Sequence, residues 1–471
     1  MGKGGRKERK YFQQVTIIDT AEEGLAIGRC EDGRIIQVRG AVPGDVADVV
    51  ALEKRKGMYI TKATSFSTLS ADRAEPFCSH FGLCGGCKWQ HMTYEAQLRY
   101  KEKRVRDAFQ RIGGFDPSII QPIIGAPRQQ YYRNKLEFTA SDKRWLTEEE
   151  MRSDEPLKKD ALGFHLPGAF DKVLDIDRCY LQADPSNDIR LFIKQFSVER
   201  EWPFFNLRLK TGFIRNVIVR NNLKGETLLV LVVGSENQDW INELVSALTS
   251  RFPQVISVYA CVNTKVNDTI HDLPVDHVYG EERLTETLHH VRYHIGPKSF
   301  FQTNSEQAAN LYALTKQLAS LTSGDNVYDL YCGVGSLGIY MADSCKSVVG
   351  IELIPEAIVD AGKNADLNKL TNTSFVVGQV ELLLDPDFVS KYGKPDVVIT
   401  DPPRAGMHPK VISHLLAAAP DRIVYVSCNP ATQARDLELL SSDYTVITAI
   451  PVDMFPQTHH IECIALLKRK G

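Results

Sequence analysis

The N-terminal part of the chain alternates short apolar runs with turn residues. Between Tyr11 and about Leu69 these runs are separated by turns that contain Gly or Pro. Short runs bounded in this way are typical of β-strands. We therefore predict a small β-barrel over residues 11–69. Barrels of this kind commonly bind nucleic acid, although a module that serves only packing has the same pattern.

A helical periodicity follows between residues 93 and 112. It places Leu98, Val105 and Phe109 on one face of an expected amphipathic helix, with Thr93 as N-cap and Gly113 as the C-terminal stop. The opposite face of this helix is predicted to be basic. Its cations are Arg99, Lys101, Lys103, Arg104 and Arg106.

The rest of the chain changes character near Pro297. Before it the pattern is mostly β with helical inserts, including one apolar strand at 227–233. After it, buried strands alternate with helices, which indicates an α/β, Rossmann-like doubly wound sheet. The expected strands of that sheet are NVYDLYC, SVVGIEL, PDVVITD, RIVYVSC and IECIALL. The predicted division is a basic tail at 1–10, the barrel at 11–69, a mixed, mainly β central domain at 70–296 and the doubly wound domain at 297–471.

Composition narrows the class of protein. The 471 residues are 43% hydrophobic and 24% charged, which is ordinary globular composition. No run of about 18 apolar residues is present, and no apolar stretch follows the basic start, so we expect a cytoplasmic protein without a membrane segment. Residues 1–140 hold 23 Lys and Arg against 16 Asp and Glu, whereas the remainder holds 33 against 43. The basic part is where phosphate contacts are expected, and a solvated face of mixed charge is the alternative.

A glycine-rich segment marks a candidate cofactor site. DLYCGVGSLG, Asp329–Gly338, follows an expected strand and opens a helix, so its backbone can approach a ligand closely. Glu352 ends the next strand, at the distance where an acid binds ribose hydroxyls. Together they fit a nucleoside cofactor, either a dinucleotide or S-adenosylmethionine. The departure from G-x-G-x-x-G favours S-adenosylmethionine, as does the stiff turn Asp401-Pro-Pro-Arg404, which can hold a planar substrate.

Cys428 is the candidate nucleophile. It ends the strand RIVYVS and precedes Asn429-Pro430, so its thiol is expected at the edge of the sheet where ligands bind. A thiolate that adds to carbon 6 of a pyrimidine makes carbon 5 able to attack a methyl donor. A base must then remove the proton from carbon 5. Glu462 is the candidate, and an edge carboxylate without a chemical role is an equally good interpretation.

Cysteine spacing predicts a metal centre. Cys78, Cys84 and Cys87 supply three thiols within ten residues of a Gly-rich loop, and Cys179 is the best-placed fourth ligand. Disulfides are not expected in a reducing compartment. Four thiolates suit zinc or an iron–sulfur cluster, and the spacing does not decide between them. Four other cysteines are expected to be small core residues: Cys30, Cys261, Cys345 and Cys463.

Over essentially its whole length the chain resembles the RNA uracil-5 methyltransferase family, in the branch that has an N-terminal TRAM domain and acts on 23S ribosomal RNA. Besides the barrel, the matching segments are CSHFGLCGGCKWQHMTYEAQ, SFFQTN, DLYCGVGSLG, DPPRAG, SCNPATQARD and DMFPQTHHIE. One departure is Ser336, where some members have Asn in the cofactor loop.

The resemblance implies an S-adenosylmethionine-dependent enzyme that methylates a flipped uridine, with RNA as partner and the protein as a monomer. It implies that Cys428 is the nucleophile and Glu462 the base. The cofactor would be bound by Gln302, Tyr331, Glu352 and Asp401. A 4Fe-4S cluster would be held by Cys78, Cys84, Cys87 and Cys179.

Other functions share parts of this pattern. The same reaction on transfer RNA stays open. A cytosine-5 RNA methyltransferase generally has a second cysteine beside the Asp401 turn, where this chain has none. A radical methylthiotransferase has a C-x3-C-x2-C motif and a TRAM domain after its catalytic domain. This chain differs in both respects, because its spacing is C-x5-C-x2-C and its barrel comes first. An RNA-binding iron–sulfur protein without catalysis needs neither Cys428 nor Glu462.

Overall fold

The computed structural model describes residues 10–146, 150–152 and 159–471, so the predicted basic tail lies outside the described residues apart from Lys10. The chain divides into two compact units. Among the described residues, the N-terminal unit comprises 10–103 with 455–460, and the larger unit comprises 104–454, apart from the two gaps, with 461–471. The limits predicted for the central and doubly wound domains, near residues 70 and 297, stay predictions.

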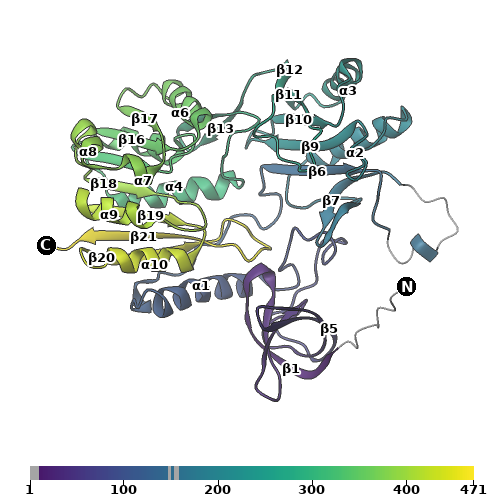
Figure 1. Ribbon diagram of the computed structural model, residues 1–471, viewed down its shortest axis with the longest axis horizontal. Helices are drawn as coiled ribbons and strands as arrows, with labels where there is room; N and C mark the ends of the chain where they lie inside the picture. Colours follow the sequence, from purple (N-terminus) through teal and green to yellow (C-terminus); the bar gives the residue numbers. More distant parts are fainter. Residues whose placement is uncertain (1–9, 147–149, 153–158) are drawn as a thin grey trace, which may run out of the picture. The chain divides into compact units, whose positions relative to one another are not determined.

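The N-terminal unit contains the predicted barrel. Its strands close in the order β1-β2-β3-β5-β4 (Figure 1). Alternate side chains such as Val15, Val38 and Val49 fill the interior, and closure leaves no free edge. The barrel prediction is therefore confirmed. The elements are β1 (Tyr11–Thr20), the 3-10 turn η1 (Glu22–Gly24), β2 (Ala26–Arg29), β3 (Ile35–Arg39), β4 (Val46–Arg55) and β5 (Met58–Thr68).

Helix α1 (Tyr94–Arg111) forms where the periodicity predicted it. Thr93 accepts a hydrogen bond from the backbone N–H of Ala96 at 3.3 Å, as an N-cap does. Val105 and Phe109 are buried as expected, whereas Leu98 is only partly buried.

The prediction of an all-basic outer face is wrong at Lys101. Its side chain is fully buried, and Nζ donates to the carbonyl of Phe455 at 3.1 Å. Arg99 and Lys103 pair with Asp72 and Asp19. Several cations of α1 thus stabilise the protein's own fold, which leaves fewer of them for phosphate.

The larger unit begins with a seven-stranded central sheet in the order β12-β11-β10-β9-β6-β7-β8. The strand expected at 227–233 is β10, and it is buried on both faces. Figure 1 shows α2 and α3 beside this sheet. The elements are η2 (Pro117–Ile119), β6 (Lys135–Ser141), η3 (Glu150–Arg152), β7 (Ala161–Leu166), β8 (Ala169–Leu174), α2 (Ser186–Glu199), β9 (Ile214–Asn221), β10 (Thr227–Val233), α3 (Gln238–Arg251), β11 (Val255–Val262) and β12 (Asp276–Gly280).

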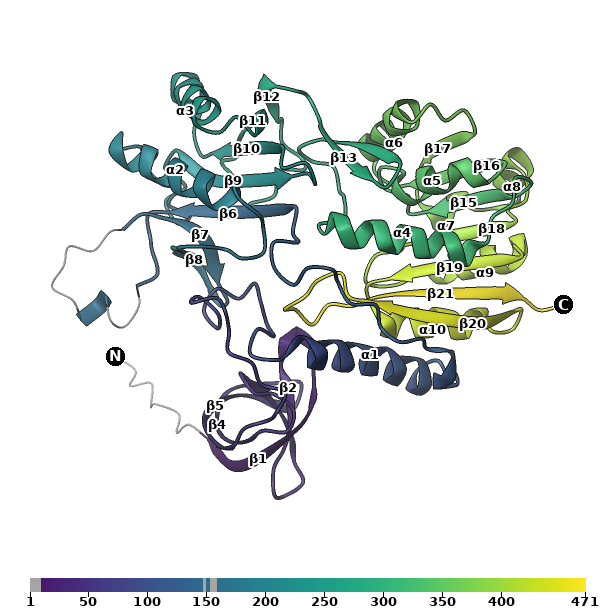
Figure 2. The ribbon, with the colours of Figure 1, turned by 180° about the vertical axis from the view of Figure 1, so that it is seen from behind.

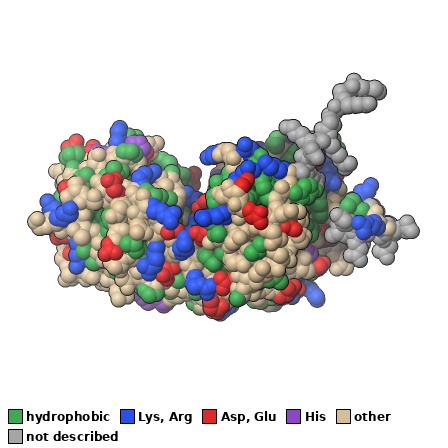
Figure 3. All heavy atoms as spheres, turned by 90° about the horizontal axis from the view of Figure 1, so that it is seen from below, with side chains coloured by type: hydrophobic (Ala, Val, Ile, Leu, Met, Phe, Trp, Pro, Cys, Tyr) green, Lys and Arg blue, Asp and Glu red, His purple; other side chains and the backbone are tan. Residues whose placement is uncertain are grey.

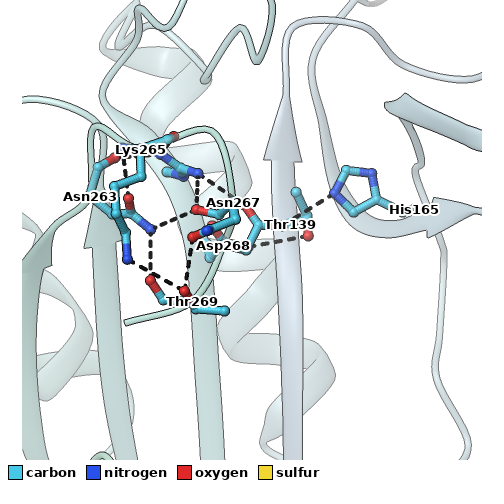
Figure 4. A network of polar contacts seen from close by, with 9 residues as sticks. Thr139, His165, Asn263, Lys265, Asn267, Asp268 and Thr269 are labelled. Atoms are coloured by element: carbon cyan, nitrogen blue, oxygen red, sulfur yellow. Dashed lines mark hydrogen bonds and ion pairs between the residues drawn. The ribbon is translucent and has the colours of Figure 1, made fainter. Parts of the chain in front are cut away.

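A polar network braces the turn after β11 (Figure 4). The guanidinium of Arg215 donates to the carbonyls of Asn263, Lys265 and Asn267 at 2.5 to 2.7 Å. It also pairs with Asp268 at 3.1 Å. One buried arginine therefore satisfies several backbone carbonyls that a turn would otherwise leave without a donor.

The C-terminal sheet has the order β17-β16-β15-β18-β19-β21-β20, with helices on both faces (Figure 2). This confirms the Rossmann-like doubly wound fold. The elements are the hairpin β13 (Leu284–Leu288) and β14 (Val291–Ile295), then α4 (Ser305–Ala319), β15 (Asn326–Leu330), α5 (Ser336–Met341), η4 (Ala342–Ser344), β16 (Ser347–Glu352), α6 (Pro355–Leu367), β17 (Thr373–Val377), α7 (Val380–Leu383), α8 (Pro386–Tyr392), β18 (Val397–Thr400), α9 (Pro409–Ala418), β19 (Arg422–Ser427), α10 (Pro430–Leu440), β20 (Tyr444–Val452) and β21 (Glu462–Arg469).

Two strands of this sheet, β17 and β20, were not among those expected. The first five strands of the order are parallel, whereas β21 runs antiparallel to both β19 and β20. The strand order reverses between β15 and β18, which makes a topological switch point. In open sheets, ligands bind outside the carboxyl ends of the strands at such a point.

The protein surface gives two further observations. Within the described part of the chain, no helix has the length and apolar character needed to cross a bilayer. The face seen in Figure 3 carries Lys and Arg side chains interspersed with Asp and Glu.

Candidate active site

The predicted site residues of the C-terminal sheet gather along one edge. Tyr331, Asp401 and Cys428 each follow directly after β15, β18 and β19, and Glu352 is the last residue of β16. These four strands are parallel and adjacent, so their carboxyl ends share an edge. Sequence reasoning could place these residues together because each stands at the end of its strand.

The glycine loop between β15 and α5 is fixed by Glu352. One carboxylate oxygen of Glu352 accepts a hydrogen bond from the N–H of Gly333, and the other accepts one from Ile354, both at 3.0 Å. Gly333 has a φ of +55°, which favours glycine. Tyr331 also has a positive φ, +64°, and such strained backbone in a non-glycine residue concentrates at ligand sites. The loop is thus held in a single shape, and each Glu352 oxygen retains a lone pair for a ligand hydroxyl.

Asp329, in β15, stabilises the end of the glycine loop. It was not among the predicted site residues. Its carboxylate accepts a hydrogen bond from the N–H of Gly338 at 2.8 Å. A Cβ at Gly338 would lie 2.8 Å from the same carboxylate, so only glycine allows this approach. Burial raises the pKa of Asp329 to about 7. The signal in the sequence was a charged residue inside a buried apolar strand.

Strand pairing brings Cys428 next to Glu462. Ser427 of β19 is opposite Cys463 of β21 in the last pair of an antiparallel ladder, and Cys428 and Glu462 are the next residues beyond that pair. Their charges interact: burial, then Glu462, then Asp401 raise the pKa of the Cys428 thiol to about 11. The free cysteine is therefore a protonated thiol at neutral pH.

Glu462 is a buried carboxyl group, only 5% exposed. Among the described residues no hydrogen bond or ion pair involves its carboxylate. Burial, followed by the charge of Asp401, raises its pKa well above the usual range, and Arg404 opposes that shift. A buried carboxyl without a structural partner is typical of a group kept for proton transfer.

Asp401 and Arg404 complete the charged groups at this edge. Burial raises the pKa of Asp401 to about 7, and in the described part of the chain its carboxylate has no hydrogen-bond partner. Arg404 lowers the pKa values of both Cys428 and Glu462. The sequence prediction named Arg404 only as part of the turn and missed this electrostatic effect.

Gln302 lies in the loop before α4 and not at the end of a sheet strand. It lies two residues before Asn304, the N-cap of α4. The Asn304 side chain donates to the carbonyl of Met454 at 2.9 Å. Met454 follows β20, whose last residue, Val452, is paired with Glu462. The loop of Gln302 is thereby tied to the strand end that carries Glu462.

The predicted metal ligands fall in different units. Cys78, Cys84 and Cys87 belong to the N-terminal unit and Cys179 to the larger one. Burial, with the nearby charge of Cys78, raises the pKa of Cys84, so two of these thiols interact. Cys179 is buried, and its backbone N–H donates to the side chain of Asn187 at 2.7 Å.

Within residues 10–146, 150–152 and 159–471, no group of three or more His, Cys, Asp and Glu side chains is arranged to hold a metal ion. The iron–sulfur centre therefore stays a prediction. The four cysteines expected in the core are all buried: Cys30, Cys261, Cys345 and Cys463.

Comparison with known proteins agrees with this geometry. A family model described as tRNA (Uracil-5-)-methyltransferase matches residues 221–470. The chain is 46% identical over 452 residues to an RNA methyltransferase of Bacteroides thetaiotaomicron, covering 95% of this chain and 99% of that protein. It is 47% identical over 463 residues to an RNA methyltransferase of Porphyromonas gingivalis, covering 97% and 99%.

A solved structure is similar over nearly the whole chain. It is the Pyrococcus abyssi tRNA (uracil-54, C5)-methyltransferase in complex with S-adenosyl-L-homocysteine, with a TM-score of 0.74 and 29% identity, covering 96% of this chain and 100% of that one. The match extends through the sheet that carries Cys428 and Glu462. This chain belongs to the RNA uracil-5 methyltransferase family.

Proposed function

We propose that this protein transfers a methyl group from S-adenosylmethionine to carbon 5 of a uridine in 23S ribosomal RNA, through a covalent adduct with Cys428. The observation that carries the proposal is the proximity of Cys428 and Glu462, which follow the last pair of the β19–β21 ladder and interact electrostatically. A thiol beside an unpartnered, buried carboxyl group supplies both the nucleophile and the base that this reaction needs.

The residues at the edge fit S-adenosylmethionine. Glu352 offers oxygen lone pairs at the end of β16, where a ribose is expected. Asp401 is a buried carboxyl group, and no described residue donates a hydrogen bond to it. Such a group suits a ligand that carries a positive charge or hydrogen-bond donors. Gln302 and Tyr331 are the other proposed contacts. When bound, the cofactor supplies an electrophilic methyl group on a sulfonium ion.

The reaction then follows from the chain's own groups. The thiol proton of Cys428 passes to solvent, and the thiolate adds to carbon 6 of the uracil ring. Carbon 5, made enolate-like by this addition, takes the methyl group as the bond between that methyl and the sulfonium sulfur breaks, and the leaving group is the uncharged thioether S-adenosylhomocysteine. Glu462 removes the remaining proton from carbon 5, and the electron pair of that bond expels Cys428. The methylated base is released, and Glu462 holds the proton until solvent takes it.

Glu462 is suited to this step because its pKa is raised. A carboxylate at its ordinary pKa is a weak base, whereas burial strengthens Glu462 as a proton acceptor. Arg404 acts in the other direction on both reacting groups, because its positive charge favours the thiolate of Cys428 and the carboxylate of Glu462. We propose that Arg404 keeps these groups ionisable in a buried site.

The substrate class rests on domain architecture. The resemblance to the family branch that has an N-terminal TRAM domain and acts on 23S ribosomal RNA supports ribosomal RNA. A second candidate, transfer RNA, is favoured by a specific finding, since the solved relative from Pyrococcus abyssi acts on uracil-54 of tRNA. Both candidates use the same site and chemistry.

We also propose that Cys78, Cys84, Cys87 and Cys179 hold a 4Fe-4S cluster. Support comes from the donor set: four Cys thiolates are the usual ligands of such a cluster, and Cys78, Cys84 and Cys87 lie within ten residues of one another. Zinc takes the same ligands, so iron content separates the two.

Mass spectrometry of ribosomal and transfer RNA from cells that lack this protein tests the proposal. Loss of one 5-methyluridine from 23S rRNA, restored by the wild-type gene and not by Cys428→Ala, is the expected result. Loss from tRNA would select the second candidate. Loss of 5-methylcytidine would indicate a cytosine-5 enzyme, and an unchanged set of nucleosides would contradict the proposed reaction. Purified Cys428→Ala should still bind S-adenosylmethionine, which distinguishes a lost nucleophile from a misfolded protein.

A further inference from the structure

We infer that Asn134, a residue of the central domain, is a positioning residue that holds Gln302 in place for the cofactor. This inference rests on the proposed function, because Gln302 is a proposed cofactor contact. It assigns the central sheet a part in cofactor binding in addition to any contact with RNA.

Asn134 lies directly before β6 and is buried. Its side-chain amide donates to the carbonyl of Gln302 at 2.9 Å and to the hydroxyl of Ser305 at 2.8 Å. Its backbone N–H donates to the carbonyl of Thr303 at 2.7 Å. One residue thus makes three hydrogen bonds to a four-residue stretch, and two of them go to the consecutive carbonyls of Gln302 and Thr303.

The contact at Ser305 continues into the interior. The Ser305 hydroxyl donates to Glu286, a buried carboxylate of β13. Glu286 also accepts hydrogen bonds from the backbone N–H groups of Leu223 and Thr287 at 3.2 and 3.0 Å. Glu286 is therefore itself held in place, and it fixes the Ser305 hydroxyl to which Asn134 donates.

A second residue of the same sheet holds the start of this loop. Arg220 of β9 is buried and donates to the carbonyl of Ser299 at 2.8 Å. Arg220 is the ladder partner of Lys135, the residue after Asn134. The register of β6 against β9 therefore sets both anchors, and the loop 299–305 is attached to the central sheet at both ends.

Two features distinguish a positioning role from simple packing. The contacts fall on backbone atoms of the loop that bears Gln302, so they define where that side chain starts. Asn134 also uses a donor geometry that no apolar residue of the same size can reproduce. Ordering a loop residue costs about 1–2 kcal/mol, and contacts made before the ligand arrives remove that cost from binding.

The test compares Asn134→Asp and Asn134→Ser with wild type in the full-length protein. Asn134→Asp keeps the shape and removes both side-chain donors; Asn134→Ser is milder in case the charged variant does not fold. Losing buried hydrogen bonds of this kind costs about 1–3 kcal/mol, which corresponds to an increase of about 5- to 100-fold in a dissociation constant. We expect an increase of about tenfold or more in the Kd for S-adenosylhomocysteine by calorimetry, and a matching rise in KM for S-adenosylmethionine with a smaller change in kcat.

Asn216→Ala is the matched control. Asn216 is equally buried in the same sheet, and its amide donates to the Thr139 hydroxyl at 3.2 Å rather than to the Gln302 loop. It should lower thermal stability and leave cofactor affinity within about twofold of wild type. Wild-type affinity in a folded Asn134 variant, or an equal loss in Asn216→Ala, would overturn the inference. If wild type itself binds neither cofactor nor product, the proposed function fails instead.

Discussion

Replacing Asp401 with Asn should make the protein more stable at neutral pH while it damages the site. The reason is that the folded protein holds a carboxylate where burial opposes its ionisation and where no described residue compensates it. Its pKa is raised from an ordinary 3.8 to about 7. Asn has almost the same shape and carries no charge.

The magnitude follows from linkage between ionisation and folding. A shift of about 3 pH units at about 1.4 kcal/mol per unit gives an upper limit of about 4 kcal/mol. Asp401 keeps some exposure to water, so we expect about 2–4 kcal/mol. Because the folded-state pKa is raised, the favourable contribution of the protonated acid is complete below about pH 4 and is lost as pH rises through about 7. The gain from Asn should thus be absent in acid and full above pH 7.

The assay is denaturant unfolding of wild type and Asp401→Asn without cofactor, near pH 4.5, 6 and 8. Asp436→Asn is the control, because Asp436 is also buried but accepts hydrogen bonds from Met407 N–H and the Tyr425 hydroxyl at 2.8 and 2.7 Å. That control should lose stability. If Asp401→Asn is destabilising, or if its effect is the same at every pH, the claim that Asp401 is an uncompensated acid is refuted.

Two other perturbations address the chemistry and the proposed cluster. Glu462→Gln should allow Cys428 to add and the methyl group to transfer but should prevent proton removal from carbon 5. We therefore expect a protein–RNA adduct that survives denaturing electrophoresis. Normal turnover would exclude Glu462 as the base. Cys179→Ser should lose iron and visible absorbance in protein purified without oxygen, with Cys261→Ser as the control because Cys261 is a buried core residue; unchanged iron content would point to another fourth ligand.

Sequence reasoning placed together those candidate site residues whose position depends on local order along the chain. Tyr331, Glu352, Asp401 and Cys428 each stand at the carboxyl end of an apolar strand, and parallel strands bring such ends to one edge. The barrel and α1 were predictable for a similar reason, since period and capping are local signals.

Other features depend on contacts between distant residues. The environment of Glu462 could not be inferred, because it requires β21 to run antiparallel beside β19 in one register. A one-residue slip would turn Glu462 to the other face of the sheet. Lys101 was placed on the surface because its helix neighbours are basic, whereas its carbonyl partner, Phe455, lies 354 residues away. The anchoring of Gln302 by Asn134 spans 168 residues and left no local signal.

The acids of the site share one electrostatic property. Burial is the first cause of the raised pKa values of Asp329, Asp401, Glu462 and Cys428, and the negative charge of Asp401 adds to the shifts of the other three. A positive charge that enters this edge must therefore lower these pKa values together.

We predict that S-adenosylmethionine, which is a cation at sulfur, binds near pH 7 with release of protons, and that S-adenosylhomocysteine, whose sulfur is uncharged, releases fewer protons on binding. Calorimetry in buffers of different ionisation enthalpy measures this difference. Equal proton release by the two ligands would mean that the acids are not coupled to the cofactor's charge; a larger release by S-adenosylmethionine would mean that binding the methyl donor also prepares Cys428 and Glu462 to react.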